Sequence, residues 1–218
     1  MSEFFGAHQR DLQERFETRA MADRVATITV HAEVQEQDKL FIESRDMFFL
    51  ASVDERGQPT CSYKGGEPGF VQVVDAKTIA FPSYDGNGMF ISMGNIRATA
   101  KIGMLFIDFE TPNRLRLHGT ASFQEGDPLM NTYPGADLIV RVTVSEIFVN
   151  CPRYIHRYQK VAPSRYVPKA ACETPFAQWK RIDKLQDVLP PRDQGKTEKA
   201  GGAISVEDYD AKVVAGEA

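Results

Sequence analysis

The sequence predicts a mainly β protein of the α+β class, in which an antiparallel sheet closes into a barrel or sandwich and carries peripheral helices. Two observations predict this fold. Short runs rich in β-branched and aromatic residues follow one another closely between residues 47 and 149. Only one helix-like stretch interrupts them, whereas alternating βαβ units would place a helix between successive strands.

The bulk composition excludes several classes of protein. A chain of 218 residues with 42% apolar and 26% charged residues can bury one sizeable core. Its net charge of −4 argues against nucleic acid or an anionic membrane as a partner. We see neither a membrane-span-like apolar run nor a secretory signal, so we expect a cytoplasmic protein. The three cysteines form no Cys-x-x-Cys pair, so we expect reduced thiols and no metal site.

Two helices and a short strand are expected before the sheet. Apolar side chains recur at helical spacing between His8 and Val25, which predicts an amphipathic helix. A short strand is expected at Ile28–Val30 and a second helix from Gln35 to Ser44. We interpret the first helix as a packing element.

The strand-like runs begin with a hairpin. The polar segment Asp54–Pro59 joins the first two runs and places Gly57 where a turn tolerates positive φ. The predicted strands are Met47–Val53, the residues from Thr60 onward, Phe70–Val74, Thr78–Phe81, Ile102–Phe109, Leu115–Phe123 and Leu138–Val149.

The stretch from Ile79 to Ile96 has the layout of an anion site. It is predicted as a buried strand, a polar glycine-containing turn and the start of a helix. Free N–H groups at a helix start carry partial positive charge, and glycine lets the backbone approach a ligand closely. The side chains of Ser83, Tyr84 and Asn87 offer hydrogen bonds, with Gly86 and Gly88 beside them. The alternative interpretation is an ordinary tight turn.

The order of motifs between about Lys39 and Asn150 resembles the pyridoxamine 5'-phosphate oxidase-like family of FMN-binding split barrels. The segments that carry the resemblance are Phe49–Pro59, Phe81–Met89, Gly103–Phe109 and Arg114–Gly119. It implies a split β-barrel of the FMN-binding type and a homodimer with flavin at the interface. It also implies that FMN mediates the oxidation or reduction of a small molecule.

The resemblance also implies that Cys61, Ser62, Tyr63 and Lys64 lie on the strand that runs along the flavin. Basic residues of the strands after the turn, such as Arg114 and Arg116, could face the same phosphate. The expected FMN-binding residues are Cys61, Ser62, Tyr63, Lys64, Pro82, Ser83, Tyr84, Asn87, Gly88, Met89, Arg114 and Arg116. The sequence departs from the oxidases that give the family its name, which have an arginine where Ser62 stands and an Arg-Lys pair where Gly88 and Met89 stand. Arg114 or Lys64 must therefore neutralise the phosphate.

We interpret the protein as an FMN-dependent oxidoreductase with an unidentified small-molecule substrate. No catalytic side chain is assigned, because the cofactor carries the redox chemistry. A flavin- or haem-binding module without turnover, acting as a cofactor carrier or redox sensor, is the alternative. A β-barrel interaction protein without any cofactor is a third hypothesis.

Four regions are expected along the chain. Residues 1–35 form a helical extension, 36–155 the split barrel, 156–190 a helical extension that packs on the barrel, and 191–218 a flexible tail. Within these regions, we expect Asn150–Tyr158 to turn back towards a ligand and Phe176–Leu189 to form a short helix. The stretch beyond Pro190 and Pro191, rich in glycine, lysine and glutamate, is expected to form a mobile linker up to Gly202.

Overall fold

The computed structural model describes residues 4–218 of the chain. By its internal contacts the chain divides into two compact units, residues 1–162 and residues 163–218. The four regions expected from the sequence remain a prediction. In the described part of the chain, no helix combines the length and the apolar character that crossing a membrane requires.

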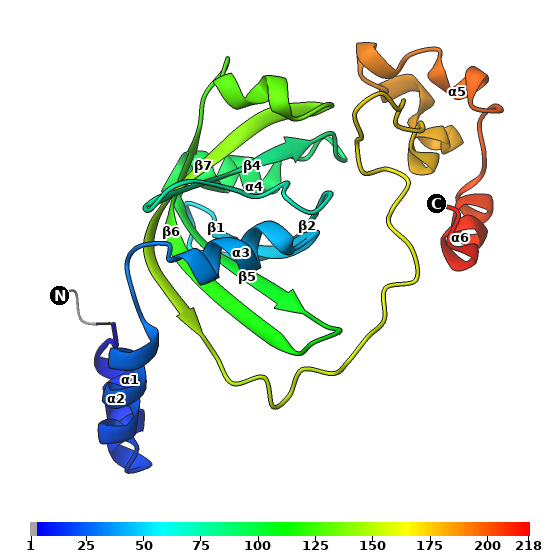
Figure 1. Ribbon diagram of the computed structural model, residues 1–218. Helices are drawn as coiled ribbons and strands as arrows, with labels where there is room; N and C mark the ends of the chain where they lie inside the picture. Colours follow the sequence, from blue (N-terminus) through cyan, green and yellow to red (C-terminus); the bar gives the residue numbers. More distant parts are fainter. Residues whose placement is uncertain (1–3) are drawn as a thin grey trace. The chain divides into compact units, whose positions relative to one another are not determined.

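The first unit is built on one curved sheet whose seven strands run in the order β2-β1-β5-β6-β7-β4-β3 (Figure 1). The strands are β1 Met47–Val53, β2 Pro59–Gly65, β3 Gln72–Asp75, β4 Thr78–Tyr84, β5 Lys101–Asp108, β6 Asn113–Phe123 and β7 Ala136–Val149. Every neighbouring pair is antiparallel. The predicted antiparallel, mainly β fold is confirmed.

A cluster of phenylalanine rings shows that the sheet curls around its core. Phe48 of β1 is fully buried, and its ring centroid lies 5.0 Å from that of Phe81 on β4. Three strands separate β1 from β4 in the sheet order, so the rings can meet only if the sheet closes on itself. Phe106 and Phe70 add ring contacts to Phe48 at 5.3 and 5.8 Å. Each such buried ring stabilises the fold by about 1.5–3 kcal/mol.

Among the described residues, four α-helices and one short 3-10 helix accompany this sheet. They are α1 Ala7–Arg15, α2 Arg19–Thr29, α3 Glu36–Ser44, α4 Ile91–Thr99 and the 3-10 helix η1 Pro128–Thr132. α3 contacts β3, while α4 contacts β1 and β6. α4 is the one helix between strands that the sequence predicted, and its position beside β1 sets up the site described below.

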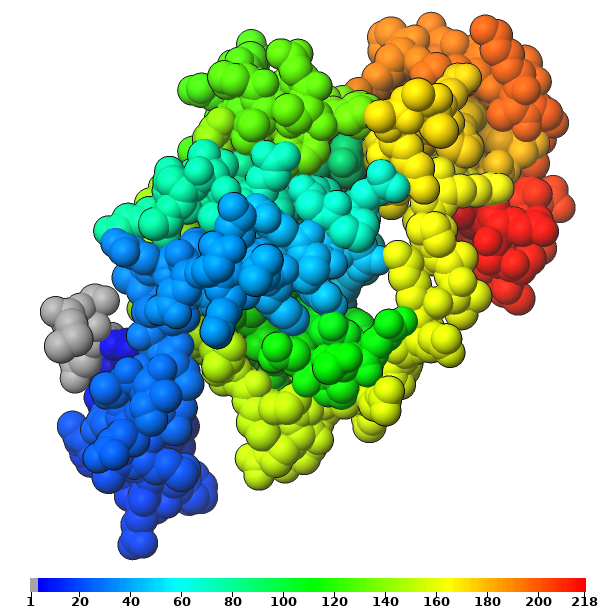
Figure 2. Space-filling view, viewed as in Figure 1, coloured from blue at the N-terminus to red at the C-terminus, as the bar shows by residue number. Residues whose placement is uncertain are grey.

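The single helix predicted for His8–Val25 is wrong, because the chain forms two helices there. Glu17 has a φ of 57°, in the left-handed region, and this conformation ends α1 before α2 starts. The strand predicted at Ile28–Val30 is also wrong, because α2 continues to Thr29. Neither helix contains a buried residue, and Figure 2 shows the pair in blue at the surface. Helical spacing of apolar residues therefore predicted one continuous helix, but little tertiary packing holds this segment and the chain forms two helices.

The second unit consists of short helices. They are the 3-10 helices η2 Gln178–Arg181, η3 Asp183–Val188 and η4 Pro191–Asp193, followed by α5 Lys196–Lys199 and α6 Val206–Ala215. The continuous helix predicted for Phe176–Leu189 is wrong. Ile182 leaves the helical conformation, with φ −56° and ψ 129°, and forms a bridge with Ile204, which separates η2 from η3. The nearby ammonium of Lys180 and carboxylate of Asp193 form a buried ion pair at 2.6 Å.

We predict that Gly119→Ala destabilises the protein. Gly119 lies at an irregularity between β6 and β7, where a Cβ atom would meet the carbonyl oxygen of Thr143 at 2.4 Å. Overpacking of this kind costs about 1–3 kcal/mol in the free energy of unfolding, which urea denaturation measures. Gly94→Ala is the matched control, because a Cβ atom there meets open space and alanine favours a helix by about 0.5–1 kcal/mol. Equal stabilities for the two variants would contradict this account.

Candidate functional site

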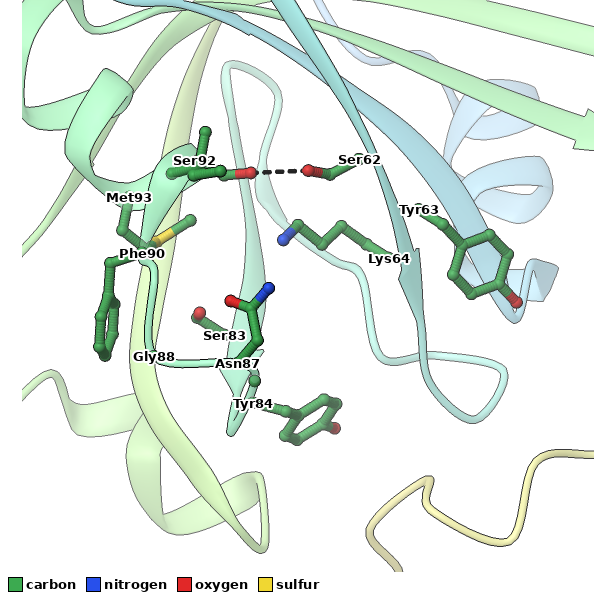
Figure 3. A pocket seen from close by; sticks show the side chains of 12 residues that line it. Ser62, Tyr63, Lys64, Ser83, Tyr84, Asn87, Gly88, Phe90, Ser92 and Met93 are labelled. Carbon is green, nitrogen blue, oxygen red and sulfur yellow. Dashed lines mark hydrogen bonds between the residues drawn. The ribbon is translucent and has the colours of Figure 1, made fainter. Parts of the chain in front are cut away.

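A cavity of about 360 Å³ lies between β2, the end of β4 and the start of α4 (Figure 3). The residues that line it are Ser62, Tyr63, Lys64, Ser83, Tyr84, Gly86, Asn87, Gly88, Phe90, Ile91, Ser92 and Met93. β2 is an edge strand, and its neighbour across the cavity is α4 instead of another strand. The cavity therefore opens where the curled sheet is split.

Alternation along β2 decides which side chains face the cavity. In the register with β1, Lys64 pairs with Phe48 and Ser62 pairs with Leu50, and both β1 residues are fully buried. Lys64 and Ser62 therefore point inward, because paired residues share one face of a sheet. Figure 3 shows the Lys64 ammonium inside the cavity, with the ring of Tyr63 turned away from it.

Burial makes Lys64 the main electrostatic feature of the cavity. Of the described residues that line it, Lys64 alone is a lysine or arginine. Removal of water from around the ammonium lowers the pKa of Lys64 from its ordinary value. A bound anion would favour the charged form and raise this pKa again. The cavity is thus built to gain free energy from a negatively charged ligand.

The first turn of α4 adds a second source of positive potential. Its first residues, Ile91, Ser92 and Met93, all line the cavity, and no side chain caps this end of the helix. The N–H groups of a first turn have no partner within the helix and carry a combined charge of about +0.5. The hydroxyl groups of Ser62 and Ser92 lie 2.9 Å apart at the same end of the cavity. Hydroxyls, amides and an ammonium therefore converge there.

A strained turn leads from β4 into α4. The side-chain oxygen of Asn87 accepts a hydrogen bond from the N–H of Met89 at 3.1 Å. Gly88 has a φ of 76° and Phe90 a φ of 49°, both in the left-handed region. Glycine adopts this conformation readily, whereas a residue such as phenylalanine pays about 1–3 kcal/mol. The turn thus stores strain directly beside the cavity.

Tyr84 and Tyr63 belong to the lining, although the ring of Tyr63 turns away from the cavity, and both are neutral phenols. Burial raises the pKa of Tyr84, and the nearby carboxylate of Glu67 raises it further. Burial also raises the pKa of Tyr63, with a smaller contribution from Asp46. Both hydroxyl groups therefore keep their protons at neutral pH and add no negative charge to the cavity.

The structure brings together some of the residues predicted from the sequence and separates others. Those in the lining are Ser62, Tyr63, Lys64, Ser83, Tyr84, Asn87 and Gly88; those outside it are Cys61, Pro82, Met89, Arg114 and Arg116. Cys61 is exposed on the opposite face of β2. Arg114 lies on β6, which β1 and β5 separate from β2, and its guanidinium donates to the carbonyl oxygen of Cys151 at 2.9 Å.

The prediction missed the residues that follow the turn. Phe90, Ile91, Ser92 and Met93 line the cavity. The signal that could have found them was present, because a helix start binds anions through its first-turn amides, and these belong to the residues just after the turn.

Comparison with known proteins identifies the family. The sequence pattern of the family described as pyridoxamine 5'-phosphate oxidase matches residues 34–167, more than half of the chain. The chain belongs to this family. The predicted resemblance is therefore confirmed, and so is the split-barrel type of the fold. A search of curated proteins found no match.

Solved structures with a similar arrangement include three proteins of low identity. HupZ from Group A Streptococcus is 22% identical over 53% of this chain and 93% of its own, with a TM-score of 0.44. An FMN-binding protein from Syntrophomonas wolfei is 10% identical over 64% of this chain and 97% of its own, with a TM-score of 0.44. HutZ from Vibrio cholerae, a heme storage protein, is 18% identical over 53% of this chain and 93% of its own, with a TM-score of 0.39.

We predict that Phe90→Gly stabilises the ligand-free protein. Glycine removes the strain of the left-handed conformation, and little apolar burial is lost because Phe90 is 56% exposed. We expect the free energy of unfolding to rise by about 1 kcal/mol, measured by urea denaturation. Met89→Gly is the control, since Met89 is similarly exposed but has no positive φ, and it should be neutral or destabilising. A loss of stability in both variants would show that Phe90 is unstrained.

Proposed function

We propose that this cavity binds the phosphate end of FMN and that the protein uses the flavin to oxidise or reduce a small molecule. One observation carries the proposal. The half-buried ammonium of Lys64, the hydroxyls of Ser62 and Ser92, and the first turn of α4 converge on one cavity in a chain of this family. These groups fit a phosphate, which needs positive charge and several hydrogen-bond donors.

The cavity can offset most of the negative charge of a phosphate without the arginines found in the oxidases that give the family its name. Lys64 contributes one positive charge, and a helix N-terminus contributes about half a charge. A phosphate monoester carries about −1.5 to −2 at neutral pH. The cavity therefore neutralises most of the phosphate charge through Lys64 and α4, and Arg114 is not needed within the same chain.

The size of the cavity favours a site that extends beyond one protomer. Cavities for small ligands measure about 300–1,000 Å³, and this one, at about 360 Å³, lies at the lower end of that range. The lining residues Phe90 and Ile91 are 56% and 46% exposed and form an apolar mouth, next to Met89, which is 64% exposed. We propose that the flavin ring projects towards this apolar mouth and that a second copy of the chain covers it. A homodimer is thus part of the proposal.

The cofactor and the protein side chains have different roles. When bound, FMN supplies hydride and single-electron transfer. The side chain of Lys64 and the amides of α4 hold the phosphate and so fix the position of the cofactor. Exclusion of water around Lys64 strengthens that attraction, because charges interact more strongly in a low dielectric. A small molecule that exchanges electrons at the open mouth is the proposed substrate.

The absorption spectrum of the purified protein tests this proposal first. We expect two flavin bands in the visible region, and FMN in the supernatant after heat denaturation. Anaerobic reduction by NADH or NADPH would then distinguish an oxidoreductase from a protein that only holds the flavin. A single strong Soret band would identify the cofactor as haem instead of FMN. A colourless protein that takes up no FMN would overturn the proposal.

We predict that Lys64→Met weakens FMN binding but leaves riboflavin binding unchanged. Loss of one charge-assisted hydrogen bond costs about 1.5–3 kcal/mol, or about ten- to a hundredfold in Kd, and riboflavin has no phosphate. Calorimetric titration of the ligand-free protein measures both ligands. Arg114→Met is the control with the same change of charge outside the cavity. If Arg114→Met lost as much FMN affinity as Lys64→Met, Arg114 would also contact the phosphate, as the sequence predicted, and the assignment to Lys64 alone would be wrong.

The same variant gives a test with a defined pH dependence. Because the pKa of Lys64 is lowered in the free protein, the ammonium loses its proton earlier than an ordinary lysine as pH rises. FMN affinity should therefore fall as pH rises above this lowered pKa, since a neutral amine attracts the phosphate less. The decline should be absent in Lys64→Met and in riboflavin titrations. A wild-type FMN affinity that does not fall relative to riboflavin affinity as pH rises to 10.5, the ordinary value for lysine, would contradict the role of Lys64.

A further inference from the structure

The face of α4 that meets the sheet edge carries a stripe of polar side chains. Ser92, Asn95 and Thr99 occupy one side of the helix, because residues three and four apart lie above one another. Ser92 is 6% and Asn95 7% exposed. A helix that packs on a core normally presents apolar residues there. This face instead makes hydrogen bonds to β1 and β2.

Asn95 lies at the centre of these contacts. Its side-chain amide donates to the hydroxyl oxygen of Ser52 at 3.1 Å and to that of Thr60 at 3.4 Å. These two hydroxyl oxygens are 3.2 Å apart, and Ser52 is 1% exposed. Asn95 therefore ties α4 to β1 and to the edge strand β2 at once.

The other members of the stripe mark its two ends. At the cavity end, the hydroxyl of Ser92 meets that of Ser62 at 2.9 Å. At the far end, the hydroxyl of Thr99 donates to the carbonyl oxygen of Val53 at 2.8 Å. Asn95 lies one turn from the cavity, whereas Thr99 lies two turns from it.

A buried polar contact of this kind favours one arrangement over its neighbours. An unsatisfied buried polar group is costly, so a shift of α4 along β2 would break all the bonds of Asn95 together. Apolar contacts tolerate such a shift more easily, because they lack direction. The network thus fixes where α4 begins relative to Lys64 on β2.

We propose that Asn95 is a positioning residue for the cavity. It sets the first-turn amides of α4 at the distance from the Lys64 ammonium at which one phosphate group meets both. This inference rests on the proposed function, since the ligand it names is the phosphate of FMN. Asn95 does not line the cavity, so its effect on the ligand passes through α4.

The test compares FMN with riboflavin in two variants of the stripe. Asn95→Leu keeps the side-chain size but removes the two hydrogen bonds that Asn95 donates. Thr99→Val removes the bond to Val53 at the far end of the helix. We expect Asn95→Leu to lower FMN affinity about tenfold and to change riboflavin affinity by less than about twofold. Thr99→Val should leave the ratio of the two affinities unchanged, even where its melting temperature falls. Equal ratios in wild type and Asn95→Leu would overturn the inference.

A second measurement tests the positioning role of Asn95 if the protein binds no flavin. The absence of flavin binding would refute the proposed function but not this role. A crystal structure of ligand-free Asn95→Leu would then decide the positioning role. We expect the start of α4 to move away from β2, with loss of the bond between Ser62 and Ser92. An unmoved α4 would mean that Asn95 does not position the helix.

Discussion

The hydrogen bonds between α4 and the edge strand β2 are the constraint on which the site depends. The sheet curls until Phe48 of β1 meets Phe81 of β4, yet β2 lies at the end of the strand order and faces a helix. A further strand at this edge would pair with β2 through backbone hydrogen bonds and leave no space for a cavity. A helix joined through side chains leaves room for a cavity instead, and it directs its N-terminus into that cavity.

Several features of the site cost stability, and the core offsets them. Phe90 adopts a left-handed conformation, and Lys64 is partly buried with its pKa lowered. The α4 stripe brings hydroxyl and amide groups into the interior. The phenylalanine cluster around Phe48 supplies the compensating apolar burial on the inner face of the same sheet. Local rules are thus broken next to the cavity, which is common at functional sites.

The sequence allowed the strands and the turn to be predicted, because both are encoded locally. Strands such as β1 are rich in apolar and aromatic residues, and the glycines and Asn87 mark the turn after β4. Arg114 was predicted beside the phosphate because its strand is basic. Arg114 does not line the cavity, because β1 and β5 separate its strand from β2, and local sequence does not reveal this strand order. The break between α1 and α2 at Glu17 was missed because nothing in the neighbouring sequence requires a residue in the left-handed conformation.

A crystal structure of the protein with FMN tests the central claim most directly. The account predicts the phosphate within hydrogen-bonding distance of the Lys64 ammonium and of first-turn amides of α4, on the same protomer. The hydrogen bonds of Asn95 to Ser52 and Thr60 should persist in that complex. A phosphate bound beside Arg114 or Arg116, with Lys64 free of it, would contradict the account.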